Sequence, residues 1–132
     1  MKKALVVDDN AFSCRVVADY LDKHGWEVQA CVSPFGVLNK VKDYSPDIIL
    51  LDLNMPGLSG GKLAALLKDK KYEHGFRVIS FSSQDESVQK DLVRKGLVDG
   101  YFVKNQSLEG LNEVVEWVNA GKKFAKAGGE AA

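Results

Sequence analysis

The chain has 132 residues, with 18 Lys and Arg side chains against 18 Asp and Glu side chains, so its formal net charge is zero. Charged residues make up 27% of the chain and hydrophobic residues 45%, which is typical of one soluble globular domain with a single core. Zero net charge argues against a bulk binder of nucleic acid or of an acidic membrane, and the longest apolar run, Ile48 to Leu51, is too short to span a bilayer.

The N-terminus and the cysteines predict a cytoplasmic protein. The chain turns acidic at Asp8, before the apolar core of a signal peptide could develop. Cys14 and Cys31 form no CxxC pair and have no pair of histidines nearby, so we expect neither a disulfide framework nor a zinc site. Both cysteines are interpreted as small core residues.

In the first part of the chain, short apolar runs alternate with helical periods. Ala4–Val7 is predicted to be a strand, residues 12–24 have helical spacing, and Gly25 is placed to end that helix. The apolar face predicted for the helix carries five residues: Phe12, Val16, Val17, Tyr20 and Leu21. Residues 26–31 then alternate between apolar and polar, which is the period of a half-covered strand.

Seven further elements are predicted after this strand. In chain order they are a helix from Pro34 to about Tyr44, a strand over 47–52, a helix from about Ser59 to Lys70, a strand over 77–82, a helix ending at Lys95, a strand over 101–103 and a helix from about Ser107 to Lys122. The strand over 47–52 is apolar without alternation, as in a central parallel strand covered on both faces. Residues 83–86 are predicted to form a capping box for the helix that follows.

Five strands that alternate with five helices predict an α/β fold, a single doubly wound parallel sheet with helices on both faces. Right-handed crossovers favour the flavodoxin-like strand order 2-1-3-4-5, in which the first and third strands lie side by side. In such sheets the binding site lies beyond the carboxyl ends of the strands. We expect the domain to span residues 1–124, followed by a frayed tail over 125–132.

Acidic residues follow two of these strands directly. Asp8 and Asp9 end the first strand and Asp52 ends the third, so three carboxylates are expected to converge. Two like charges about 4 Å apart repel by about 4 kcal/mol at an effective dielectric constant near 20, so the cluster must protonate or attract cations. Mg²⁺ is the natural partner because it prefers oxygen ligands, and Lys104, just after the last strand, adds a positive charge.

Ser82 ends the fourth strand, so its hydroxyl can point into the same crevice. A carboxylate, a metal site, a lysine and a hydroxyl together suit phosphoryl transfer, with Asp52 as the nucleophile that forms an aspartyl phosphate. Taken alone, each residue has a simpler interpretation: Asp8 and Ser82 as helix caps, Asp52 as an Asx turn and Lys104 as a solvated lysine. The prediction rests on their joint placement at the ends of four strands.

From Lys3 to about Lys122 the chain resembles a response-regulator receiver domain of the chemotaxis-regulator type, the phosphoacceptor half of a bacterial two-component system. Four segments carry the resemblance: Val6–Asn10 with the acidic pair, Asp47–Gly57 with the phosphorylation segment, Phe81–Ser83 with the switch hydroxyl, and Asp99–Lys104 with an aromatic residue and the lysine.

The resemblance implies a phosphoprotein that signals and is not an enzyme in the ordinary sense. Asp52 would accept the phosphoryl group from a phosphohistidine of a histidine kinase or phosphotransfer protein. Mg²⁺ would be bound by Asp9 directly, by Asp8 largely through water, and by Asp52 and the backbone carbonyl of Asn54. Lys104 would pair with Asp52 and later with a phosphoryl oxygen.

The resemblance also implies how the signal would leave the site. Ser82 would move to bond the phosphoryl group, and Tyr101 would turn inward. Asn54 and Gln84, two residues beyond the phosphoacceptor and the switch hydroxyl, would tune self-dephosphorylation. The surface of the fourth helix, fifth strand and fifth helix would then change its affinity for a downstream protein, with no direct contact to nucleic acid or membrane.

The chain departs from the family pattern at two positions. Asn105 stands where a proline after a cis bond is usual; since a cis bond before another residue costs about 2.5–4 kcal/mol, we predict a trans Lys104–Asn105 bond and a reshaped loop. Ser83 stands where a small apolar residue is commoner, so two serines can compete for the switch role.

Two other functions stay open from the sequence. One is a pseudo-receiver that keeps the fold without turning over phosphate. The other is a small phosphatase with an aspartate nucleophile, although such enzymes usually carry a second aspartate where this chain has Asn54. The sequence names neither the kinase nor the output partner. It also leaves open a monomer or a phosphorylation-dependent homodimer, and a free-standing receiver or part of a longer protein.

Overall fold

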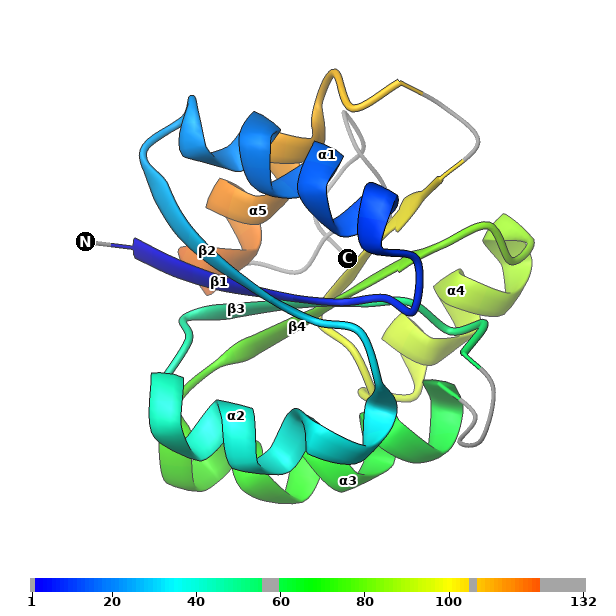
Figure 1. Ribbon diagram of the computed structural model, residues 1–132. Helices are drawn as coiled ribbons and strands as arrows, with labels where there is room; N and C mark the ends of the chain where they lie inside the picture. The colour runs from blue at the N-terminus through cyan, green and yellow to red at the C-terminus, as the bar shows by residue number, and fades with distance from the viewer. Residues whose placement is uncertain (1, 56–59, 105–106, 122–132) are drawn as a thin grey trace.

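The structure, a computed structural model, describes residues 2–55, 60–104 and 107–121 (Figure 1). Its elements in chain order are β1 (Lys2–Val7), α1 (Ala11–Asp22), β2 (Trp26–Cys31), the 3₁₀ turn η1 (Pro34–Gly36), α2 (Val37–Tyr44), β3 (Ile48–Leu51), α3 (Gly60–His74), β4 (Arg77–Ser82), α4 (Glu86–Arg94), β5 (Gly100–Val103) and α5 (Leu111–Asn119). No helix within these ranges has both the length and the apolar character that crossing a bilayer demands.

The five strands form one parallel sheet in the order β2-β1-β3-β4-β5, which confirms the predicted topology. Helices α1 and α5 cover one face, and α2, α3 and α4 cover the other (Figure 1). All four residues of β3 are fully buried, as expected for a central strand between two helical layers. Val7 of β1 pairs with Leu51 of β3, so both chains leave the sheet at the same level.

Alternation along the strands builds a separate core on each face of the sheet. In β1, Leu5 and Val7 join the core under α2, α3 and α4, whereas Ala4 and Val6 join the core under α1 and α5. Burying each large aliphatic side chain contributes about 1.5–3 kcal/mol, so the two cores hold the strand ends in fixed positions.

Three helix starts differ from the sequence prediction. The segment from Pro34 begins as the 3₁₀ turn η1 before α2 proper. α4 begins at Glu86 with no capping box, because the Ser83 hydroxyl accepts a hydrogen bond from the Asn54 side chain instead. α5 begins at Leu111 and not at Ser107, since the residue before it, Gly110, has a φ of 90°, in the left-handed region that interrupts a helix.

The apolar face predicted for α1 is wrong in part. Val17 and Leu21 are buried as expected, together with Cys14, but Phe12 is 76% exposed and Val16 is 39% exposed. Five apolar residues occupy a broader arc of the helix than the sheet and α5 can cover. The first turns of α1 therefore present large apolar side chains at the surface.

Two sequence predictions lie outside the described residues. The Lys104–Asn105 bond and its loop form one of them, and the tail over 125–132 forms the other. The trans bond and the domain boundary at residue 124 remain predictions.

The two sides of α1 should differ sharply in their contribution to stability. Leu21→Ala removes a fully buried side chain and should lower the free energy of unfolding by about 2–5 kcal/mol. Phe12→Ala removes an exposed ring and should change it by less than about 0.5 kcal/mol. Urea unfolding of both variants measures the contrast, and similar losses in the two would contradict the orientation of α1.

Candidate functional site

Backbone hydrogen bonds of the sheet continue one residue beyond the strands and align the residues that follow β1, β3 and β5. The N–H of Asp52 donates to the carbonyl of Val7 at 2.9 Å, and the N–H of Lys104 donates to the carbonyl of Ser82 at 2.8 Å. The N–H of Asp8 likewise donates to the carbonyl of Cys31 at 3.1 Å. These three bonds hold the first residues after β1, β3 and β5 at one edge of the sheet, where their side chains meet.

Three aspartates converge at this edge, as the sequence predicts. Asp8, Asp9 and Asp52 each offer an oxygen, and these atoms all lie within 4.8 Å of one another. Asp8 and Asp52 are buried, whereas Asp9 is exposed. An all-oxygen donor set that is open on one side fits Mg²⁺, because this ion prefers oxygen ligands and keeps several of its waters.

Lys104 lies between two of the acids. Its ammonium forms a hydrogen-bonded ion pair with Asp8 and lies 3.5 Å from Oδ2 of Asp52. Its side chain is largely buried and passes over the ring of Phe81, with Nζ 5.5 Å from the ring centroid. The resemblance implies a pair with Asp52, whereas the nearer partner here is Asp8.

The environment shifts the two buried acids in opposite directions. Burial raises the pKa of Asp52 above its ordinary value of 3.8, and the charge of Asp8 adds to the rise, while the Asn54 N–H and Lys104 offset it only in part. Burial also acts to raise the pKa of Asp8, but the hydrogen bond and charge of Lys104 and the N–H of Asn10 outweigh it, so this pKa lies below 3.8. A negative charge is therefore less favourable on Asp52 than on Asp8.

Of the two candidate switch serines, only Ser82 is buried. Its hydroxyl oxygen accepts hydrogen bonds from the Asn54 side-chain amide at 3.3 Å and from the N–H of Gln84 at 3.2 Å. Both contacts use the oxygen as an acceptor and leave the hydroxyl proton for an acceptor such as a phosphoryl oxygen. Ser83 is exposed, and its hydroxyl accepts from the same Asn54 amide at 3.2 Å.

The two predicted tuning residues contact each other. The Gln84 side-chain amide donates to Oδ1 of Asn54 at 2.6 Å, and the Asn54 N–H donates to Oδ1 of Asp52 at 3.1 Å. Asn54 thus links the carboxylate at the end of β3 to the loop after β4, and its side chain is already engaged on both ends.

Gln89 supports this loop, and the sequence analysis missed it. It is a fully buried residue of α4 whose Oε1 accepts from the Ser80 hydroxyl at 2.6 Å. Its Nε2 donates to the carbonyls of Ser82 and Gln84, at 3.1 and 3.0 Å. A buried amide is costly unless its polar atoms are bonded, and here they hold the chain on both sides of Ser83. The sequence did contain a signal for its burial, because Gln89 lies one helical turn before Val93 and therefore on the same face of α4.

Tyr101 ties β5 to the first turn of α4. Its ring is fully buried, and its hydroxyl donates to Oε1 of Glu86 at 2.6 Å. Burial and the Glu86 carboxylate both raise the pKa of the Tyr101 hydroxyl above its ordinary range, so it remains a donor. The ring that was expected to turn inward thus already lies in the interior.

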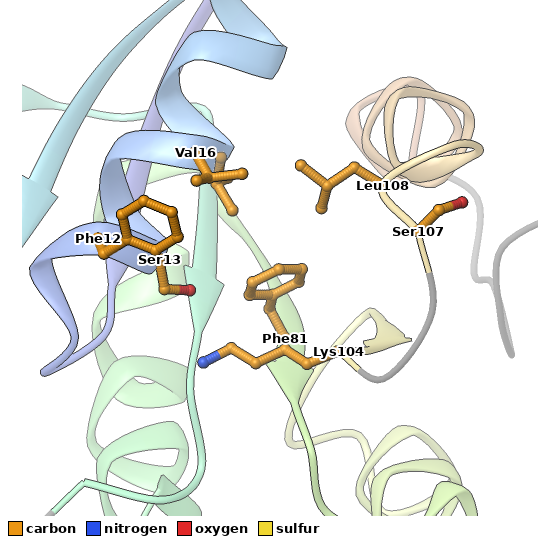
Figure 2. A pocket seen from close by; sticks show the side chains of 8 residues that line it. Phe12, Ser13, Val16, Phe81, Lys104, Ser107 and Leu108 are labelled. Carbon is orange, nitrogen blue, oxygen red and sulfur yellow. The ribbon is translucent and has the colours of Figure 1, made fainter.

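An apolar pocket of about 320 Å³ opens beside Lys104, on the α1 side of the sheet edge. Figure 2 shows Phe12 and Val16 of α1 across the opening from Leu108, with Phe81 at its floor and Lys104 at one end. The exposed apolar residues of α1 therefore line a surface that adjoins the acidic cluster.

Comparison with known sequences identifies the family. Residues 4–116 match the family model of the response regulator receiver domain. The chain belongs to this family. The match confirms the resemblance that the motifs predict. Receiver domains act in phosphorylation-dependent signalling of two-component systems and bind Mg²⁺ at an acidic pocket.

Curated relatives differ in length. The chain is 24% identical over 115 residues to the polar-differentiation response regulator DivK of Brucella ovis, and the match covers 87% of this chain and 94% of DivK. It is 28% identical over 116 residues to an uncharacterized 76.5 kDa protein of Thiocystis violacea, of which this chain spans only 17%.

Solved structures agree with the fold. The response regulator TrrA of Thermotoga maritima, in complex with Mg²⁺–BeF, superposes with a TM-score of 0.77 at 28% identity, covering 88% of this chain and 97% of TrrA. The chemotaxis protein CheY4 of Vibrio cholerae superposes with a TM-score of 0.80 at 23% identity, covering 89% of this chain and 98% of CheY4.

Neutralising Asp52 should stabilise the protein at neutral pH when divalent ions are removed by EDTA. The pKa of Asp52 in the folded protein lies above its ordinary value of 3.8, so its negative charge destabilises the fold at any pH above the folded-state pKa. This cost disappears as the pH falls below 3.8, because Asp52 is then protonated in both the folded and the unfolded protein. We expect Asp52→Asn to raise the melting temperature at pH 7 by about 4 °C, equivalent to about 1 kcal/mol.

Thermal unfolding between pH 3 and 8 measures this difference. Asp9→Asn is the matched control, because it removes a charge of the same cluster from an exposed position and should give a smaller gain. A gain for Asp52→Asn that grows on acidification, or no gain at all, would contradict the assigned direction.

Proposed function

We propose that this protein is a signalling switch that accepts a phosphoryl group on Asp52 from a histidine kinase or a phosphotransfer protein. The observation that carries the proposal is the convergence of three carboxylates, with Lys104 beside them, at one sheet edge of a receiver domain. The raised pKa of Asp52 supports its role, because a carboxylate held at a cost gains by forming a bond that spreads its charge over phosphoryl oxygens.

Asp8, Asp9 and Asp52, with the backbone carbonyl of Asn54, would hold the Mg²⁺ ion. The all-oxygen composition of the cluster supports this assignment, as does the Mg²⁺–BeF complex of TrrA. When bound, the ion supplies positive charge to the phosphoryl oxygens and relieves the repulsion among the three aspartates.

In the proposed transfer, a carboxylate oxygen of Asp52 attacks the phosphorus of the phosphohistidine. The new P–O bond forms as the P–N bond breaks, and the histidine nitrogen leaves with the electron pair of that bond. Lys104, held by Asp8 and 3.5 Å from Asp52, can follow the negative charge onto a phosphoryl oxygen without a large movement.

The proton of the Ser82 hydroxyl is the group we expect to sense the new phosphoryl oxygens. Movement of Ser82 would pull on the backbone that Gln89 holds and would reach α4 through that amide. Since the Tyr101 ring is already buried, we expect the change to act on its hydrogen bond to Glu86. The output would be an altered affinity of the α4, β5 and α5 surface for a downstream protein.

The pocket beside Lys104 supports docking of a protein donor. Exposed Phe12 and Val16 face Leu108 next to the acidic cluster (Figure 2), so a helix carrying the phosphohistidine would cover apolar surface while presenting its phosphoryl group to Asp52. We place this exchange in the cytoplasm, as the sequence analysis predicts.

Phosphatase activity on small esters is the less favoured function. Such catalysis needs an acid and base next to the nucleophile, and this position holds Asn54, whose amide is bonded to Ser82, Ser83 and Gln84. Multiple turnover should therefore be negligible.

Incubation with acetyl phosphate and Mg²⁺, followed by intact-mass measurement, tests the proposal. The wild-type chain should gain one phosphoryl group, and Asp52→Asn should gain none. Lys104→Met should react about tenfold slower or more, because a hydrogen bond to a charged group contributes about 1.5–3 kcal/mol and each 1.36 kcal/mol is tenfold in rate. Exposed Ser83→Ala is the control and should react like wild type.

Two outcomes would overturn this assignment. An adduct that persists in Asp52→Asn would mean that another residue is the acceptor. Failure of the wild-type chain to react with several phosphodonors would favour the pseudo-receiver. Size-exclusion chromatography of the same samples reads whether phosphorylation produces a homodimer.

The pocket beside Lys104 should matter for a protein donor and not for a small one. Phe12→Ser should slow transfer from a phosphorylated histidine kinase by about tenfold, which corresponds to about 1.4 kcal/mol, and leave the rate with acetyl phosphate unchanged. Phe35→Ser is the matched control, since Phe35 is 73% exposed but lies next to α2. Equal slowing with both donors, or by both variants, would exclude this docking site.

A further inference from the structure

A second apolar groove lies on the opposite helical layer, between α2 and α3. These two helices cover the sheet face that lies away from α1 and α5 (Figure 1). The groove has a volume of about 310 Å³, and its lining comprises Pro34, Phe35, Leu38, Asn39, Leu63 and Leu66. None of these residues belongs to the acidic site or to the pocket beside Lys104.

The rim of this groove carries large apolar side chains that the core does not use. Phe35 is 73% exposed, Leu66 is 44% exposed and Leu38 is 37% exposed, while Leu63 is buried at the floor. Phe35, Leu38 and Leu66 do not belong to the core, whose members on these helices are Val37, Val41, Tyr44, Leu63, Ala64 and Leu67. Adjacent exposed apolar side chains around a groove are typical of a surface that binds a partner.

The excess of positive charge on α2 and α3 favours an acidic partner. Over residues 37–44 and 62–70 there are five lysines against two aspartates, whereas the whole chain has a net charge of zero. Lys42 follows Leu38 by one helical turn on α2, and Lys70 follows Leu66 by one turn on α3. Asp43 is adjacent to Lys42 and Asp69 is adjacent to Lys70, so the two segments are positive on balance but not uniformly so.

We propose that the groove between α2 and α3 binds an acidic amphipathic helix of a partner protein. Apolar side chains one turn apart on that helix would contact Phe35, Leu38 and Leu66 above Leu63, in the helix-in-groove mode. Acidic side chains flanking its apolar stripe would meet Lys42 and Lys70, so electrostatic complementarity sets the specificity.

A second copy of this chain fits the groove less well. Its acidic helix, α5, turns its valines inward, because Val114, Val115 and Val118 are fully buried against the sheet. Among the described helices α5 carries the largest negative charge, and it has no apolar stripe left to offer. Helix α1 exposes Phe12 and Val16 but is less acidic, since Arg15 offsets one of its two aspartates. The inference goes beyond the phosphorylation switch and does not depend on Asp52.

Titration of the ¹⁵N-labelled protein with two synthetic helical peptides tests the proposal. Both peptides carry leucines at i, i+3, i+4 and i+7; one has glutamates at the flanking positions and the other has lysines. We expect the acidic peptide to shift backbone amide resonances within 35–42 and 62–70 and to bind about tenfold more tightly than the basic one.

Surface variants give the matched controls. Phe35→Ser and Leu66→Ser should each weaken binding of the acidic peptide by about tenfold, whereas Phe12→Ser on the other layer should leave it unchanged. The double variant Lys42→Glu/Lys70→Glu should reverse the preference and favour the basic peptide. Because these side chains are exposed, the variants should fold like wild type, which the remaining amide resonances report.

Several outcomes would overturn the proposal. These are equal affinity for the two peptides, no binding of either peptide, or shifts that map to α1 in place of α2 and α3. Self-association in sedimentation velocity that is abolished by Phe35→Ser would assign the groove to a second copy instead. The measurements use no phosphodonor, so a failure here is distinguishable from a failure of the switch.

Discussion

Mutual repulsion among Asp8, Asp9 and Asp52 is the force that the carboxyl edge of the sheet must balance. Backbone hydrogen bonds and the two cores fix the ends of β1 and β3, which keeps the three aspartates close to one another. Like charges at such separations cost several kcal/mol, so the edge needs positive charge. Lys104 supplies part of it and favours Asp8, so of the two buried acids Asp52 has the less compensated charge.

A polar network connects this edge of the sheet to α4. Asn54 joins the end of β3 to Ser82, Ser83 and Gln84, and Gln89 holds the same loop from inside α4. Every link is a hydrogen bond between side chain and backbone or between two side chains. These bonds are the contacts through which we propose that phosphorylation reaches α4.

The two apolar grooves lie on opposite helical layers. One adjoins Lys104 on the layer of α1 and α5, where we propose that a phosphodonor approaches Asp52, and the other lies on the layer of α2 and α3. The sheet separates them, so one partner can be bound while another reaches the site. In both grooves the exposed apolar residues lie on helices whose apolar face is wider than the part that packs against the sheet.

The sequence by itself determined the strand order and the convergence of the acids, because unbroken apolar runs mark central parallel strands and parallel strands end at a common edge. It identified the family from the same residues. Only the tertiary structure decided that Phe12 and Val16 are exposed, that Lys104 pairs first with Asp8, and that Gln89 holds the loop after β4. These features depend on how much of a helix its neighbours cover and on which polar atoms the fold brings within hydrogen-bonding distance. The periodicity of apolar residues along the sequence contains neither kind of information.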